Sequence, residues 1–125
     1  MNDESDKDLR VRTKFFALRV VKVFSSLPKT TEAQVMGKQV LRSGTSVGAH
    51  YREACRARST WEFISKIEGG LQELEETVYW LELLVEAGIV NEERLKPLLQ
   101  EADELIAILV SSVKRAKTRL PKKSS

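Results

Sequence analysis

Residues 64–88 read ISKIEGGLQELEETVYWLELLVEAG, and this stretch decides the fold class. Its apolar residues recur at alternating three- and four-residue steps, which is the spacing of a helix that contributes one seam to a bundle. The predicted seam consists of Ile64, Ile67, Leu71, Leu74, Val78, Leu81 and Val85. Ser59 and Glu62 have the spacing of a capping box that starts this helix, and Gly88 suits the left-handed position that ends it.

Two further helices are predicted before this one. The first runs from Leu9 to Leu27 and ends there, because the residue before Pro28 is pushed out of helical geometry. The second runs from Glu32 to Ala57, and Thr31 with Gln34 forms the capping box that opens it.

The middle of the second helix is rich in small residues. They are Ser43, Gly44, Thr45, Ser46, Gly48 and Ala49. A glycine inside a helix costs about 1 kcal/mol relative to alanine, so another interaction must offset that cost. Either the small residues permit a close approach of two helices, or they shape a kink or a groove for a partner.

A fourth helix is predicted after Asn91, whose side chain suits an N-cap. Its apolar stripe consists of Leu95, Leu98, Ala102, Leu105, Leu109, Val113 and Ala116. Four helices of similar length with short connections predict an all-α protein, an antiparallel up-down-up-down four-helix bundle. We expect the bundle domain at residues 9–118, a disordered acidic segment at 1–8 and a flexible basic tail at 119–125.

Length and composition are those of one ordinary globular domain. The chain has 125 residues, of which 42% are hydrophobic and 31% charged, and this composition excludes a disordered or membrane-embedded protein. The acidic N-terminus is the opposite of a secretory signal. A single cysteine, Cys55, allows no intramolecular disulfide and favours a reducing compartment. The cytoplasm of a prokaryote is therefore the expected location.

Charge is distributed unevenly along the chain, and the net charge of +3 conceals this. Residues 1–8 carry a net −3, and residues 9–58, with eleven basic and two acidic residues, carry +9. Residues 59–113, with three basic and twelve acidic residues, carry −9, and residues 114–125 carry +6. The first two helices are therefore strongly basic, the last two are strongly acidic, and the C-terminal segment is basic again.

Three functions are compatible with this division. Basic and acidic faces attract each other within one bundle, or between copies that close into a ring. Alternatively, the basic surface binds RNA or DNA by neutralising phosphates. The residues predicted to do so are Lys38, Arg42, Arg52 and Arg56 on one stripe of the second helix, with Lys114, Arg115 and Lys117 as a second patch. A simply solvated charged face stays open as the plain alternative.

Signatures of enzymes are missing from the sequence. A di-iron bundle needs two Glu-x-x-His motifs, and the chain has one histidine, His50. The spacing of His50 and Glu53 places both on one side of a helix, but two ligands make a weak metal site. Cys55 stands in no recognisable nucleophile arrangement. We therefore expect no catalytic residue, no metal, no cofactor, no small-molecule substrate and no membrane partner.

The second and third helices carry motifs that resemble a known family. Ser46, Val47, Ala49, Glu53 and Ala54 match a Ser-Val/Ile-x-Ala-Asn-x-x-Glu-Ala/Gly core, in which His50 replaces the usual asparagine. Ser59, Phe63, Ile64 and Lys66 resemble a Ser-x-x-x-Phe-Ile-x-Lys segment, and residues 76–84 resemble Glu-Thr-x-Tyr-Trp-Leu-x-Leu-Leu. The family is that of four-helix bundles first noticed in proteins encoded by intervening sequences of bacterial 23S rRNA genes. Gly69 and Gly70 depart from the residues more common in it.

The resemblance implies an assembly as well as a fold. Members of this family are expected to form ring-shaped homopentamers. A related branch, the accessory variability proteins of diversity-generating retroelements, binds nucleic acid and a reverse transcriptase. The resemblance therefore implies self-association and RNA or DNA binding, with a reverse transcriptase as a further partner. A protein-interaction scaffold without nucleic acid is the competing function.

Overall fold

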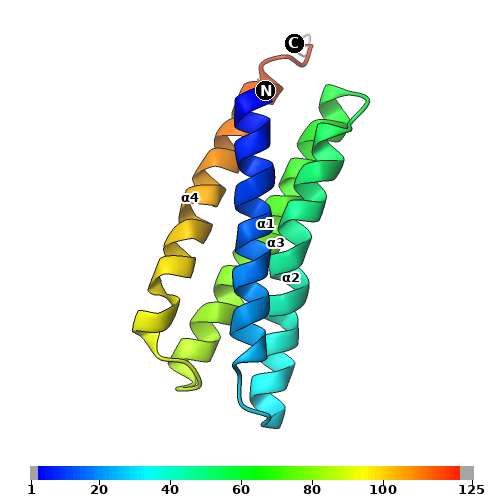
Figure 1. The fold of residues 1–125 in the computed structure, drawn as a ribbon. Coiled ribbons are helices and arrows are strands. Elements are labelled where there is room, and N and C mark those ends of the chain that lie inside the picture. The colour runs from blue at the N-terminus through cyan, green and yellow to red at the C-terminus, as the bar shows by residue number, and fades with distance from the viewer. Residues whose placement is uncertain (1–2, 122–125) are drawn as a thin grey trace.

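The computed structural model describes residues 3–121, and these residues form four helices and no strand. The helices are α1 (Asp3–Ser25), α2 (Thr31–Cys55), α3 (Thr60–Glu86) and α4 (Glu92–Lys117). They lie side by side along their length, and both ends of the chain lie at the same end of the molecule (Figure 1). The predicted all-α class and its four helices are thus confirmed.

The first helix begins earlier than predicted. It starts at Asp3 and not at Leu9, so most of the acidic segment expected to be disordered is helical. Asp6 explains this, because its carboxylate accepts hydrogen bonds from the Tyr51 hydroxyl at 3.0 Å and the Cys55 thiol at 2.7 Å. Asp6 also pairs with Arg10 one turn later, and acidic residues suit the positive end of a helix dipole. Residues 1–2 lie outside the described part of the chain.

The helix ends follow the predicted capping chemistry with one exception. Ser59 caps α3 by accepting a hydrogen bond from the Glu62 amide, and Asn91 caps α4. Gly88 has a φ of 73°, the left-handed conformation that the sequence predicted after α3. The N-cap of α2 is Thr30 and not Thr31, because its side chain accepts from the amide three residues on.

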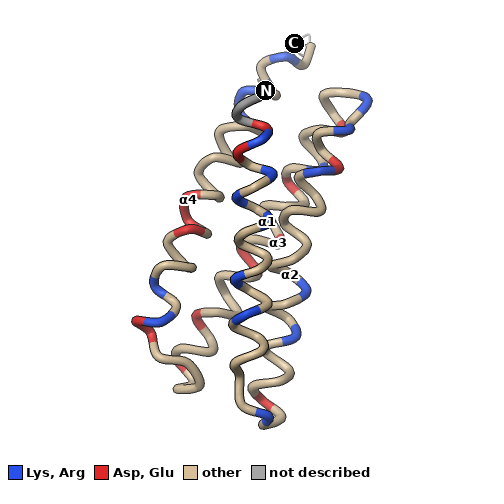
Figure 2. The backbone as a smooth tube through the Cα atoms, in the orientation of Figure 1, with Lys and Arg blue, Asp and Glu red and all other residues tan. Residues whose placement is uncertain are grey.

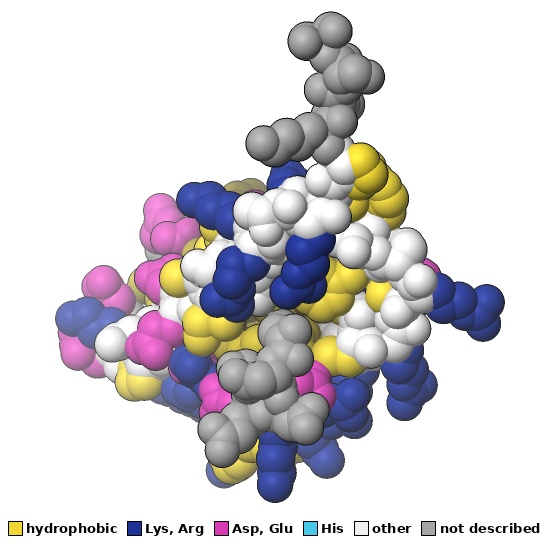
Figure 3. Space-filling view, turned by 90° about the horizontal axis from the view of Figure 1, so that it is seen from above, with side chains coloured by type: hydrophobic (Ala, Val, Ile, Leu, Met, Phe, Trp, Pro, Cys, Tyr) yellow, Lys and Arg dark blue, Asp and Glu magenta, His cyan; other side chains and the backbone are white. Residues whose placement is uncertain are grey.

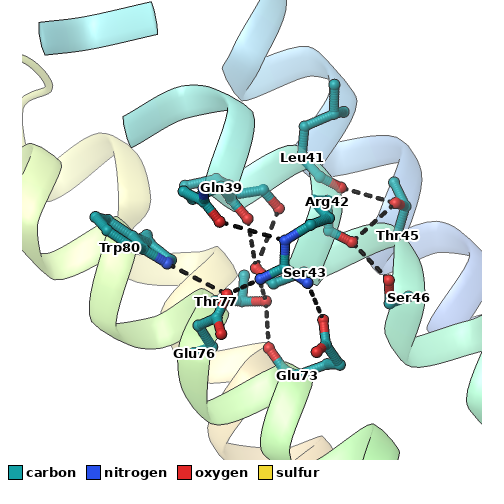
Figure 4. Close-up of polar contacts among 11 residues, drawn as sticks. Gln39, Leu41, Arg42, Ser43, Thr45, Ser46, Glu73, Glu76, Thr77 and Trp80 are labelled. Carbon is teal, nitrogen blue, oxygen red and sulfur yellow. Dashed lines mark hydrogen bonds and ion pairs between the residues drawn. The ribbon is translucent and has the colours of Figure 1, made fainter. Parts of the chain in front are cut away.

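The buried face of α3 differs from the predicted seam in every second turn. Gly70, Thr77 and Leu84 are buried there, whereas the predicted Leu71, Val78 and Val85 are half-buried. The helix is turned so that its small residues face α2, against which it packs most extensively. At this contact the Thr77 hydroxyl donates a 2.8 Å hydrogen bond to the Ser43 hydroxyl in the interior (Figure 4). A buried polar pair therefore replaces part of the apolar seam.

The small residues of α2 serve close packing against α1. A Cβ atom added to Gly44 would lie 2.7 Å from a methyl carbon of Val20, and one added to Gly48 would lie 3.2 Å from the Thr13 hydroxyl oxygen. Glycine at these positions lets the two backbones approach more closely than any side chain would allow. The first of the two explanations for residues 43–49 therefore accounts for both glycines.

The predicted stripe of α4 is buried throughout and completes the core. Beyond the helix, the half-buried Leu120 packs against this core, so the predicted flexible tail does not begin directly at residue 119. The rest of that tail, residues 122–125, lies outside the described residues. No helix in the described part of the chain is long and apolar enough to cross a membrane.

Candidate nucleic-acid interface

The four predicted basic residues of α2 are all exposed on its surface. Lys38 and Arg56 are separated by 18 positions, which corresponds to about 27 Å along a helix. They therefore reach most of the length of α2 and do not converge on one site. Lys38 lies toward the α1–α2 turn and Arg42 near the middle of α2, whereas Arg52 and Arg56 lie toward the α2–α3 turn (Figure 1).

Arg42 differs from the other three because acidic residues of α3 already engage it. Its guanidinium donates to Glu73 at 2.9 Å and to Glu76, so it bridges the two helices (Figure 4). Within the described part of the chain, Lys38, Arg52 and Arg56 have no ion-pair partner. Their charges are therefore available to an external ligand, whereas that of Arg42 is largely compensated.

The second predicted patch occupies the last turn of α4. Lys114, Arg115 and Lys117 are all exposed there. Lys117 lies 3.8 Å from the Glu68 carboxylate of α3, whereas Lys114 and Arg115 form no ion pair among residues 3–121. The rest of the basic C-terminal segment falls mostly outside those residues.

The fold brings the two patches to one end of the bundle. The C-terminal ends of α2 and α4 lie at the same end of the molecule (Figure 1). We call this the basic end and define it by Arg52, Arg56, Arg58, Lys114, Arg115 and Lys117. Figure 3 views the molecule from this side and shows lysine and arginine side chains around it. The sequence alone did not predict this convergence, because the two patches are separated by more than fifty residues.

A group of acidic residues lies at the far end of the bundle. Glu82, Glu86, Glu92 and Glu93 are exposed around the α3–α4 turn at the far end of the bundle (Figure 2). Exposed charges more than about 10 Å apart are screened from each other, so these four glutamates do not cancel the potential of the basic end. Asp8, Glu53 and Glu62 are exposed closer to the basic end, and Lys29 is exposed at the far end. The charge division along the chain is therefore only in part a division between the two ends of the molecule.

A groove of about 660 Å³ opens near the basic end, between α2, α3 and α4. Its lining includes His50 from α2, Trp61 and Gly69 from α3, and Lys117 from α4. The side chain of Trp61 is 64% exposed. Sequence reasoning missed Trp61, although a large aromatic residue two positions after the Ser59 cap, between polar neighbours, was a usable signal.

The family-motif residues divide between packing and surface. Val47 and Ala54 are buried in the core, and the Ser46 hydroxyl donates to the backbone carbonyl of Arg42. Ala49 is exposed. These four positions therefore do not form a site by themselves.

His50 and Glu53, the remaining motif residues, lie at the edge of the groove. The His50 Nδ1 atom lies 3.5 Å from the Glu53 carboxylate, which also pairs with Lys66 at 3.4 Å. A Cβ atom added to Gly69 would lie 3.2 Å from the imidazole ring, so glycine makes room for that ring. The described residues contain no group of three metal-ligating side chains.

A second polar cluster joins α1 to the end of α2. Hydrogen bonding by the Cys55 thiol lowers the pKa of Asp6, which also accepts from Tyr51. Burial raises the pKa of the Cys55 thiol and of the Tyr51 hydroxyl. A thiol with a raised pKa is a poor nucleophile, because the thiolate is the reactive form. The cluster therefore ties the helices together and does not resemble a catalytic centre.

Comparison with known proteins agrees with the four-helix fold. The family model of the 23S rRNA-intervening sequence protein matches residues 7–111. A crystal structure of a protein of unknown function from the S23 ribosomal protein family of Bacteroides thetaiotaomicron superposes with a TM-score of 0.82 at 38% sequence identity. The match covers 87% of this chain and 97% of that chain. The comparison with curated proteins gave no match. The chain belongs to the 23S rRNA-intervening sequence protein family.

Proposed function

We propose that this protein is a non-enzymatic, self-associating helical bundle that binds RNA or DNA through its basic end. The observation that carries the proposal is the convergence of two basic patches, from α2 and α4, at one end of the fold. Arg52, Arg56, Lys114 and Arg115 are exposed there and form no ion pair with residues 3–121. Unpaired cations on a compact surface are what a phosphate backbone requires.

Binding of this kind is electrostatic and carries little sequence information. Each phosphate that an arginine or lysine neutralises releases a counterion, so affinity falls steeply as the salt concentration rises. Arg52 and Arg56 are one helical turn apart on the same face, and their planar guanidinium groups suit bidentate contacts to phosphate. We expect these two residues to contribute most.

The test compares two double charge reversals. In Arg52→Glu/Arg56→Glu the change falls on the basic end, and in Lys29→Glu/Lys38→Glu an equal charge change falls on exposed residues toward the other end. Fluorescence anisotropy with labelled RNA and DNA oligonucleotides should show at least a tenfold loss of affinity for the first variant. Its slope of log affinity against log salt concentration should be shallower by about 2. Equal losses in both variants would mean that net charge alone matters and would refute the assignment to the basic end.

Self-association is proposed from an exposed apolar stripe on α1. Val11, Phe15 and Leu18 are 51%, 63% and 54% exposed, at helical spacing that places them on one face. Single exposed apolar side chains are ordinary, but a contiguous stripe marks an interaction surface. Lysines at positions 7, 14 and 22 accompany this stripe.

A complementary surface is available on α3. Glu75, Glu82 and Glu86 are exposed on the same face as Tyr79, which is 56% exposed. We propose that α1 of one copy docks on this face of the next, a heterologous contact that closes into a ring. The unit would be an antiparallel up-down-up-down bundle, and the ring a homopentamer. Phe15→Glu should dissociate it in light scattering, whereas Lys38→Glu should not.

The second candidate function is a protein-interaction scaffold, and the same α1 stripe favours it. In that case the basic residues pair with acidic neighbours in the ring and bind no nucleic acid. Light scattering of Arg52→Glu/Arg56→Glu distinguishes the two functions. An intact oligomer that has lost nucleic-acid binding supports our proposal, and a dissociated oligomer supports the scaffold. A reverse transcriptase partner and a cytoplasmic location belong to the proposal in either form.

A further inference from the structure

The groove at the basic end has the chemical character of a site for a flat, polar, aromatic ligand. Trp61 lies on one side with most of its side chain in solvent. Indole rings are usually buried, because each has a large apolar area to remove from water. An indole that is mostly exposed beside a groove therefore offers ring surface on which a ligand can stack.

The charges inside the groove largely compensate each other. Lys117 lies 3.8 Å from Glu68, and Lys66 lies 3.4 Å from Glu53. A phosphate gains little from cations that are already paired, so the groove itself is poorly suited to the nucleic-acid backbone. Unpaired cations such as Arg56 and Arg58 lie instead in the α2–α3 turn, three to five residues before Trp61.

Hydrogen-bonding groups surround the stacking face. Gln72 provides donors and an acceptor, Glu68 provides an acceptor, and the hydroxyl of Ser65 provides a donor and an acceptor. These are the groups that recognise the polar edge of a nucleobase. Gly69 has no side chain, so no atoms beyond its backbone fill the groove beside the imidazole ring.

We propose that this groove accepts one unstacked nucleobase of a single-stranded RNA or DNA, with Trp61 as the stacking platform. The inference rests on the proposed nucleic-acid function and adds the preferred form of the ligand. Phosphates on either side of the base contact the unpaired arginines of the turn. A duplex cannot use the groove, because its bases are stacked on each other and paired, so the protein prefers single strands.

Two measurements test the subsite. The variant Trp80→Phe leaves Trp61 as the only tryptophan of the chain. Titration of this variant with unlabelled ten-residue oligo(U) or oligo(dT) should quench the fluorescence of Trp61. In anisotropy, Trp61→Ala should weaken single-strand binding about tenfold, which is about 1.4 kcal/mol. The same variant should leave the salt slope and binding of a ten-base-pair duplex unchanged, and Trp61→Phe should restore most of the affinity. Because Trp61 is mostly exposed, its replacement does not threaten folding.

The outcomes separate this inference from the function on which it rests. If neither single strands nor duplexes bind at low salt, both the proposed function and the subsite fail. If oligonucleotides bind but Trp61→Ala weakens single strand and duplex equally, or not at all, the subsite alone is refuted. Comparable quenching by oligo(U) and oligo(dT) indicates recognition of the base. Quenching by one of them only indicates that the sugar or the methyl group also contributes.

Discussion

Replacing Gly44 by alanine should destabilise the protein, although alanine is the better helix former. Alanine favours a helix interior over glycine by about 1 kcal/mol. Against this gain, the new Cβ would lie 2.7, 2.8 and 3.1 Å from three carbon atoms of Val20. Val20 is fully buried and β-branched, so it has no alternative rotamer in a helix and cannot move aside. Overpacking of such a core costs about 1–3 kcal/mol, and we expect a net loss of about 1–2 kcal/mol.

Gly70→Ala is the matched control, because it makes the same chemical change in the neighbouring helix. The nearest atom to a Cβ at Gly70 is the His50 Cβ at 3.4 Å, which is an ordinary contact. Only the gain in helix propensity remains, so this variant should be more stable by about 0.5–1 kcal/mol. The same substitution thus changes the free energy of unfolding in opposite directions at the two positions, because the space beside each glycine differs.

Urea unfolding followed by circular dichroism measures both effects. The protein concentration must be the same in each experiment, because self-association raises apparent stability. The decisive test repeats Gly44→Ala in a Val20→Ala background, where the two methyl carbons nearest the new Cβ are absent. The penalty should then fall to about zero or become a gain. An unchanged penalty, or a stabilised single variant, would refute the reasoning.

Three further predictions concern polar contacts. Arg42→Ala should lower the free energy of unfolding by at most about 1 kcal/mol, and less at high salt, because its ion pairs are exposed; urea unfolding at two salt concentrations checks this. Thr77→Val should cost about 1–2 kcal/mol, and much less in a Ser43→Ala background, since the buried hydroxyls bond each other; a double-mutant cycle measures the coupling. The pKa of Asp6 is lowered from 3.8 by its bond to the Cys55 thiol. The stabilising effect of Asp6 is therefore complete above pH 3.8 and is lost as the pH falls through the lower pKa of the folded state. Acid unfolding of Asp6→Asn should show a weaker dependence of stability on pH in this range.

The sequence predicted those parts of the fold that depend on local pattern. Helix capping by Ser59 and Asn91 and the turn at Gly88 depend on residues within one helical turn, and all three were correct. The helical start at Asp3 could not be predicted, because Asp6 is held by Tyr51, 45 positions away. Local periodicity contains no information on such a contact.

The core of α3 and the candidate site show the same limit. A hydrophobicity pattern assigns Leu71 to the core, whereas the contact with α2 buries Gly70, a position that has no apolar side chain to indicate its burial. The exposed basic residues were identified by type and spacing. Which of them carry a free charge depended on partners from another helix, as for Arg42, and the groove beside Trp61 exists only once three helices are placed together.

The contact between His50 and Gly69 has a consequence for the order in which this sequence could change. These two positions lie nineteen residues apart in the sequence, and here they touch. A side chain at position 69 would press on the imidazole ring. We expect Gly69→Ala to be less well tolerated beside His50 than beside a smaller side chain at position 50. The effects of substitutions at these two positions should therefore not be additive, and a laboratory change of one should be paired with a change of the other.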